Sequence, residues 1–135
     1  MILHIDDRQL IADLQDRFSD CFPFLKIEFY TKSHHWKEGT PDEYLIPASR
    51  TIGSIRKIHY AGDMTIKSWY TTGEVEKAFK NTFGLNVQIF RNENGEWVQT
   101  SATDGYSLKQ QSDLARYATY TVFPKLKDRM EEFEV

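Results

Sequence analysis

The sequence predicts an α+β protein, a two-layer sandwich built from two βαβ units. The main observation is a repeated phrase: FPFLKIEFY at 22–30 and FGLNVQIF at 83–90 each follow a stretch with helical spacing of apolar residues. A second observation is that a short strand candidate precedes each helical stretch, ILHI at 2–5 and MTIKSWY at 64–70. Because a helix can bury its apolar stripe only against a sheet or another helix, we expect both helices to cover one shared sheet.

Length and composition allow this architecture within one domain spanning 1–135. The chain has 135 residues, of which 40% are hydrophobic and 27% charged, as in ordinary globular proteins that bury a core. The single cysteine, Cys21, excludes an internal disulfide, and the start of the sequence shows no leader or membrane span, so we expect a cytoplasmic protein. The net charge of -3 argues against nucleic-acid and membrane partners.

The first helix is predicted over 7–20. Leu10, Leu14 and Phe18 recur every four positions, as one buried helical face requires. Asp6 and Gln9 have the spacing of a capping box, in which each side chain bonds to the backbone of the other residue.

The second helix is predicted over 72–83 by the same signals. Thr71 and Glu74 form the capping box, and Val75, Phe79 and Phe83 supply the apolar face. Gly84 should end the helix, because glycine readily adopts the left-handed conformation found after helices.

Each helix is followed by a half-buried strand. Polar and apolar residues alternate over 25–29 and over 85–89, which is the period of a strand with one buried face. Two strand–helix–strand units in tandem resemble the ferredoxin-like sandwich, with a mixed or antiparallel sheet. The resemblance covers roughly residues 1–91 and concerns architecture only, since no functional motif accompanies it.

The segment between the units allows two interpretations. SIRKIHY at 54–60 and MTIKSWY at 64–70 predict a hairpin around Ala61, Gly62 and Asp63. However, TIGSIRK at 51–57 resembles the helix start TTGEVEK at 71–77, and a helical turn there would shorten the hairpin.

A further hairpin should add a C-terminal strand. Its loop, NENG at 92–95, fits either a two-residue turn or a four-residue loop. The two-residue turn places Glu93 opposite Glu96, whereas the longer loop pairs Arg91 with Glu96 and Phe90 with Trp97. Because like charges opposite one another are destabilising, we predict the four-residue loop.

Terminal helices are expected after this hairpin. Asp104 and Gly105 form a turn, and Ser107 with Gln110 makes a capping box for the next helix. After Pro124, apolar residues again recur at helical spacing.

One face of the predicted sheet is the candidate binding surface. Alternation places polar and aromatic residues together on the side away from the helices, and exposed aromatics favour recognition. The candidate binding residues are Tyr30, Gln88, Phe90, Trp97 and Gln99. The alternative is that residues 107–133 pack across this face and make it part of the core.

No residue pattern points to a metal or a catalytic group. His34 and His35 are adjacent, so on an extended chain they point to opposite sides, and no further ligand stands at zinc-site spacing. Cys21 is read as a small buried or half-buried residue at a helix end, where a thiolate is disfavoured. We therefore expect neither a cofactor nor a metal.

These observations favour a small protein-binding or adaptor module without catalytic activity, whose partner is another protein or a second copy. The alternative is a small enzyme or ligand-binding protein with a pocket between the sheet and the 32–50 loop, using His34, His35 and Asp104. A third interpretation, single-stranded RNA binding through the sheet aromatics, is disfavoured by the acidic balance. The absence of familiar catalytic motifs leaves enzymatic activity undecided.

Overall fold

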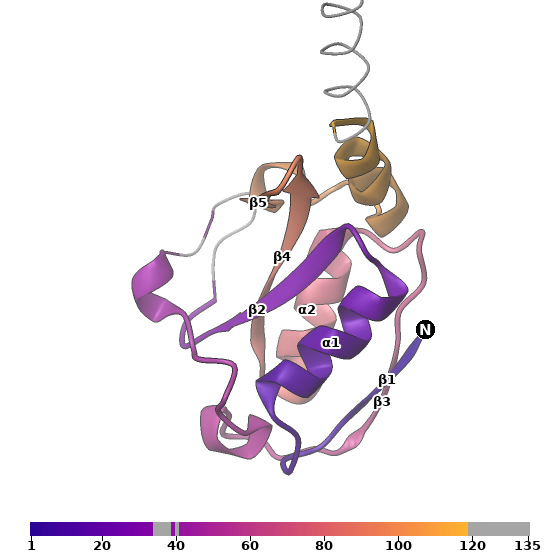
Figure 1. Cartoon of the computed structure of the whole chain (residues 1–135). Coiled ribbons are helices and arrows are strands. Elements are labelled where there is room, and N and C mark those ends of the chain that lie inside the picture. Colours follow the sequence, from indigo (N-terminus) through magenta and orange to yellow (C-terminus); the bar gives the residue numbers. More distant parts are fainter. Residues whose placement is uncertain (34–38, 40, 119–135) are drawn as a thin grey trace, which may run out of the picture.

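The computed structural model describes residues 1–33, 39 and 41–118 and has the α+β class that the sequence predicts (Figure 1). The strands are β1 (Ile2–Ile5), β2 (Leu25–Tyr30), β3 (Gly62–Thr65), β4 (Asn86–Glu93) and β5 (Glu96–Gln99). The helices are α1 (Ile11–Cys21), α2 (Thr72–Phe83) and a third over 108–118, and short 3-10 turns span Asp42–Tyr44, Ile52–Ile55 and Ser101–Thr103.

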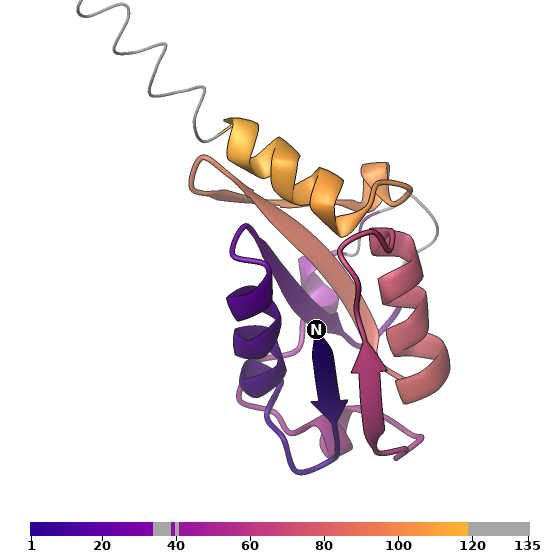
Figure 2. The ribbon, with the colours of Figure 1, turned by 90° about the vertical axis from the view of Figure 1, so that its right-hand side faces the viewer.

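The described strands form two antiparallel sheets, one of β1 and β3 and one ordered β2, β4, β5. The first strands of the two units therefore pair with each other, and so do the second strands. Figures 1 and 2 show the two sheets on opposite sides of the core, with α1 and α2 flanking them on the other two sides. The ferredoxin-like arrangement of βαβ units on one shared sheet is not confirmed, because β1 and β2 lie in different sheets.

The two units are related by a local two-fold axis. They align without a gap over 3–22 and 64–83, and again over 25–30 and 85–90. Leu3 is paired directly with its own counterpart Met64, and Glu28 with its own counterpart Gln88. A two-fold axis through both pairs produces this antiparallel pairing of equivalent positions, so the repeated phrase reflects an internal symmetry.

The symmetry extends to the start of each helix. The first N–H groups of a helix have no partner within the helix and need acceptors elsewhere. In both units, the first two of these groups donate to carbonyls of a later segment. The bonds are Ile11 N to Arg50 O at 2.9 Å, Ala12 N to Ala48 O at 3.1 Å, Thr72 N to Tyr106 O at 3.0 Å and Gly73 N to Asp104 O at 3.0 Å.

The core lies between the two sheets and the two helices. Each helix presents apolar residues spaced three or four apart, and each strand presents every second residue, as the two periodicities require. The buried residues include Ile11, Leu14 and Phe18 of α1, Val75, Phe79 and Phe83 of α2, and Ile27, Phe29, Val87 and Ile89 of the strands.

The prediction of α2 is confirmed in bounds and caps, whereas α1 begins four residues later than predicted. Asp6 N does donate to Gln9 Oε1 at 2.8 Å, but this bond closes a loop ahead of the helix. The cap of α1 is Leu10, whose N–H donates to Asp13 Oδ2 at 2.9 Å. A capping-box pattern thus marked a turn that precedes the helix.

The predicted hairpin between 54–60 and 64–70 is wrong. Ile52–Ile55 form a 3-10 turn, and β3 pairs with β1. The resemblance of 51–57 to a helix start was the better guide, since Thr51 directly precedes the 3-10 turn over Ile52–Ile55.

The four-residue loop predicted for the final hairpin is also wrong. Glu93 is paired with Glu96, and Asn94 and Gly95 form a two-residue turn with φ of 55° and 93°. An ion pair offsets the like charges, because Arg91 Nε donates to Glu93 Oε2, and Gly95 N donates to Asn92 Oδ1 at 2.8 Å to hold the turn itself. The repulsion anticipated from the pairing is thus neutralised from within the same strand.

Candidate functional site

The error in register leaves the predicted face intact. Side chains alternate along a strand, so a shift by two residues keeps each one on its original side of the sheet. Phe90 is opposite Gln99 instead of Trp97, but Gln99 and Trp97 both belong to the side that carries Phe90. The pairing of β2 with β4 places Tyr30 and Gln88 on that side as well.

Exposure divides the five candidate residues into two groups. Tyr30 is 3% exposed and Gln88 is fully buried, so neither offers a contact to a partner. Gln88 Nε2 instead donates to Glu76 Oε2 at 3.2 Å and to Ile89 O at 2.8 Å. Burial raises the pKa of the Tyr30 hydroxyl far above its usual range, so this group stays protonated.

The remaining aromatic residues form an exposed cluster around a lysine. The Lys26 ammonium lies 4.9 Å from the centre of the Trp97 ring and 5.3 Å from that of Phe90, while Trp97 stays 41% exposed. A separate contact joins Arg116 of the helix over 108–118 to Phe24, with the guanidinium 5.5 Å from the centre of the ring. We call Lys26, Phe90 and Trp97 the cation–aromatic surface.

Sequence reasoning identified only part of this surface. Strand alternation places Lys26 on the same face as Tyr30, but its role depends on contacts with two rings from other strands. The separate contact between Phe24 and Arg116 has no sequence signal, because a contact between a turn and a distant helix leaves no local pattern. Gln99 has intermediate exposure and remains at the border of the surface.

The described part of the C-terminal region does not cover Trp97. The helix over 108–118 is anchored instead by Leu108, Gln111 and Ala115, all fully buried. Gln111 Oε1 accepts a hydrogen bond from Arg91 at 2.8 Å, on the opposite side of β4 from Phe90. The predicted helix after Pro124 lies outside the described residues.

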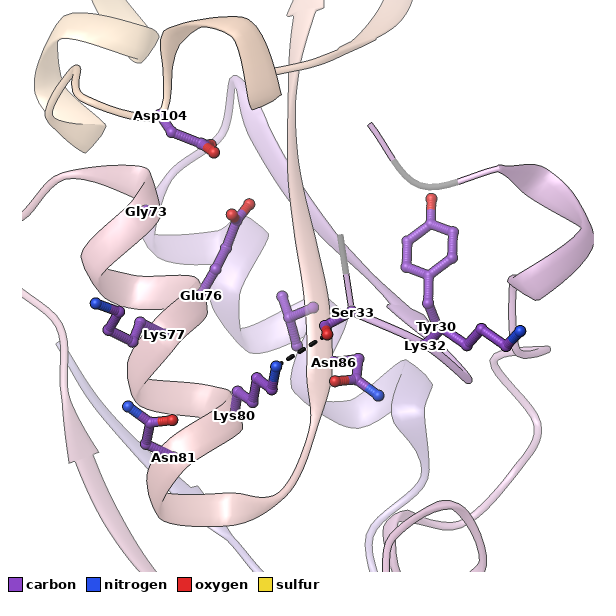
Figure 3. Close-up of a pocket in the computed structure, with 11 residues that line it drawn as sticks. Tyr30, Lys32, Ser33, Gly73, Glu76, Lys77, Lys80, Asn81, Asn86 and Asp104 are labelled. Carbon is purple, nitrogen blue, oxygen red and sulfur yellow. Dashed lines mark hydrogen bonds between the residues drawn. The ribbon is translucent and has the colours of Figure 1, made fainter. Parts of the chain in front are cut away.

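A pocket of about 400 Å³ lies at the other end of β2 and β4 (Figure 3). Its walls are α2, the end of β2, the start of β4 and the turn at Asp104. The lining residues are Tyr30, Lys32, Ser33, Gly73, Glu76, Lys77, Lys80, Asn81, Asn86, Val87 and Asp104. Asp104, a candidate group of the alternative interpretation, lines this pocket, whereas His34 and His35 lie outside the described residues.

Two histidines near the ends of β1 and β3 each contact aspartates. His4 Nδ1 lies 2.8 Å from Asp63 Oδ1, and His59 Nδ1 lies 2.7 Å from Asp7 Oδ2. Buried Arg56 holds Asp7 from the other side through Nε at 2.8 Å. Among residues 1–33, 39 and 41–118, no three histidine, cysteine or carboxylate side chains are arranged to hold a metal ion.

The interpretation of Cys21 as buried or half-buried is wrong, because the residue is exposed at the end of α1. Helix spacing explains the difference: Leu14, Phe18 and Phe22 follow one another at intervals of four and are buried, so Phe22 takes the last core position in place of Cys21. Within the described residues, no helix has the combined length and apolarity needed to cross a bilayer.

Comparison with known proteins gives no relative from which a role can be transferred. No family model, no curated protein and no solved structure matches this chain.

Proposed function

We propose that the protein is a binding module whose cation–aromatic surface recognises an acidic, extended segment of a partner protein. The observation that carries the proposal is the position of Lys26 over two rings, one of which, Trp97, remains 41% exposed. Aromatic rings held by neighbouring side chains supply contact area at little cost in conformational entropy, and such residues dominate binding energy at interfaces.

The positive charge of this surface favours an acidic partner. Lys26 places one cation over the two rings, and its ammonium also pairs with Glu28, whose Oε2 lies 3.9 Å from Nζ. A partner carboxylate can therefore pair with a cation while its neighbouring apolar side chain contacts a ring. β5 is the outer strand of its sheet, so an extended segment would lie beside it.

The test is a titration with two synthetic peptides, one alternating glutamate with phenylalanine and one alternating lysine with phenylalanine. We expect saturable binding of the acidic peptide only, followed by fluorescence anisotropy. Trp97→Ala should weaken binding by at least about tenfold, and Lys26→Met should weaken it by several-fold.

Lys67 and Trp69 provide a matched control. The Lys67 ammonium lies 5.8 Å from the Trp69 ring, and Trp69 is 69% exposed, but this pair follows β3, away from the cation–aromatic surface. Lys67→Met and Trp69→Ala should leave binding unchanged. Equal binding of both peptides, or equal losses in the control variants, would contradict the proposal.

Two other occupants are distinguished in the same samples. Light scattering that shows a dimer in the wild type and a monomer in Trp97→Ala would identify a second copy as the partner instead. Salt-dependent binding of a single-stranded oligonucleotide that requires Lys26 would favour RNA recognition. Either result replaces the acidic segment as the occupant.

A further inference from the structure

The outer edge of β3 presents backbone groups that no other described element satisfies, and it belongs to a different sheet from the cation–aromatic surface. Met1 N donates to Ile66 O at 2.8 Å and Ile66 N donates to Met1 O at 2.9 Å, which sets the phase of the β1–β3 ladder. Bonded and non-bonded pairs alternate along an antiparallel ladder, so Asp63 and Thr65 turn their N–H and C=O groups away from β1. Within residues 1–33, 39 and 41–118, these outward groups have no hydrogen-bond partner.

The corresponding edge of β1 is covered by side chains of its own unit. Gln9 Nε2 donates to His4 O at 2.8 Å, and Arg17 Nη2 donates to Ile2 O at 3.1 Å. Both acceptors are the carbonyls that β1 turns away from β3. The outer edge of β1 is therefore occupied from within the chain.

The second unit lacks this covering. Figure 2 shows α2 beside β3 as α1 lies beside β1, but the positions equivalent to Gln9 and Arg17 carry Tyr70 and Ala78. Alanine has no side-chain donor, and Tyr70 packs against the core. The two-fold relation thus fails at one functional point, because it leaves one of two equivalent edges uncovered. An uncovered strand edge is a template for a further strand.

The exposed side chains of this edge are self-complementary. Asp63 and Lys67 lie two positions before and two after Thr65, and all three are exposed. In an antiparallel pair of β3 edges with a two-fold axis at Thr65, each aspartate lies opposite a lysine. An axis at Asp63 would oppose two aspartates, and an axis at Met64 or Ile66 would leave both charges unpaired. No turn connects two separate chains, so side-chain pairing decides the register.

We propose that two copies of the chain associate through antiparallel pairing of their β3 edges, with the two-fold axis at Thr65. The pairing joins two two-stranded sheets into one of four strands, in the order β1, β3, β3, β1. Thr65 exchanges N–H and C=O bonds with Thr65 of the second copy, and Asp63 pairs with Lys67 of the second copy. Asp63 Oδ1 lies 2.8 Å from His4 Nδ1 of its own chain, but the Asp63 side chain stays 64% exposed and accessible to that lysine.

The test is sedimentation equilibrium of the full chain from about 10 µM to about 1 mM. We expect a concentration-dependent dimer in the wild type. Lys67→Glu and Asp63→Lys should each weaken dimerisation by at least about tenfold, because every dimer contains the altered pair twice. Thr65→Pro should weaken it as well, since it removes an N–H that points outward and none that bonds to β1.

An equimolar mixture of the Lys67→Glu and Asp63→Lys variants tests the register. In the mixed dimer, both cross-strand positions again combine a cation with a carboxylate, so a heterodimer should form where neither variant dimerises alone. Lys32→Glu makes the same change of charge next to β2, in the other sheet, and should dimerise as the wild type does. Trp97→Ala should also dimerise normally, because the cation–aromatic surface lies outside this edge.

Circular dichroism of each variant separates loss of association from loss of folding. A wild type that stays monomeric over the whole range would overturn the proposal. So would a dimer that survives both Lys67→Glu and Thr65→Pro, or a variant mixture that stays monomeric. A dimer lost in Trp97→Ala would place the interface on the cation–aromatic surface instead.

Discussion

At the scale of single residues, the β1–β3 sheet contains a histidine held between two carboxylates. His4 is opposite Asp63 across the ladder, and its Nε2 lies 3.1 Å from Asp6 Oδ2. Both ring nitrogens donate only when the imidazole is protonated. The hydrogen bond to Asp63, followed by that to Asp6, therefore raises the pKa of His4 above its ordinary value of 6.5.

We predict that His4 stabilises the fold below pH 6.5 and that this contribution is lost as the pH rises through the raised pKa of the folded state. A histidine whose pKa is raised by folding contributes fully below the unfolded value of 6.5, and its contribution is lost as pH rises through the folded pKa. Urea unfolding of wild type and His4→Gln should therefore show a stability difference that shrinks above pH 6.5.

Three neighbouring charges define the control for this prediction. Asp6 and Asp63 contact the imidazole, and Arg8 contacts Asp6, whose pKa it lowers mainly through its backbone N–H. Asp63→Asn should move the His4 ring titration, followed by NMR, back toward 6.5. A stability difference that is constant across this pH range would show that the contacts do not require protonation.

Helix caps could be predicted from the sequence where both residues of the capping box lie within one helical turn. Thr71 and Glu74 form the predicted box, because Thr71 Oγ1 accepts from Glu74 N at 3.0 Å. The same spacing at Asp6 and Gln9 did not identify the helix start, since a capping-box bond can also close a loop. Helix α1 is positioned instead by bonds to residues near 50, which lie far along the chain.

At the scale of elements, the final hairpin shows how a turn can determine register. Asn94 and Gly95 both have positive φ, the conformation of a two-residue turn that matches the twist of antiparallel strands. The preference of this turn for asparagine and glycine outweighed the repulsion between Glu93 and Glu96. Local charge was therefore a poorer guide to register than backbone conformation.

We predict that Gly95→Ala destabilises the protein by about 1 kcal/mol, whereas Gly105→Ala has little effect or is slightly stabilising. A Cβ at either position meets nothing within 4 Å, so sterics outside the backbone do not differ. Of these two glycines, only Gly95 has a positive φ, of 93°. Urea unfolding of the two variants isolates this backbone term, and equal stabilities would contradict it.

At the scale of the whole molecule, each of the two symmetry-related units contains one hydrogen bond between a glutamine and a glutamate. Gln15 of α1 donates to Glu28 of β2, and in the second unit Gln88 of β4 donates to Glu76 of α2. Gln15 and Glu76 are counterparts, as are Glu28 and Gln88. The amide and the carboxylate have thus changed places between helix and strand, and each unit keeps one of each.

We predict that Gln88→Glu alone destabilises the fold by about 2 kcal/mol, because it places a second carboxylate beside buried Glu76. Combining it with Glu76→Gln reproduces the order found in the first unit, and should recover about 1 kcal/mol or more. A double-mutant cycle measured by urea unfolding tests this coupling. Simple additivity of the two single changes would show that the pairs are not equivalent.

The sequence by itself determined the local elements: the α+β class, the bounds of α2, the strands after each helix, and which residues share a face of β4. Helical spacing, strand alternation and caps are properties of neighbouring residues, so they can be read without a fold. Tertiary structure alone decided which strands pair, how the sheet divided in two, and why Gln88 is buried while Trp97 is exposed. Strand edges form hydrogen bonds with strands some sixty residues away. The burial of a side chain depends on which residues those distant strands place against it.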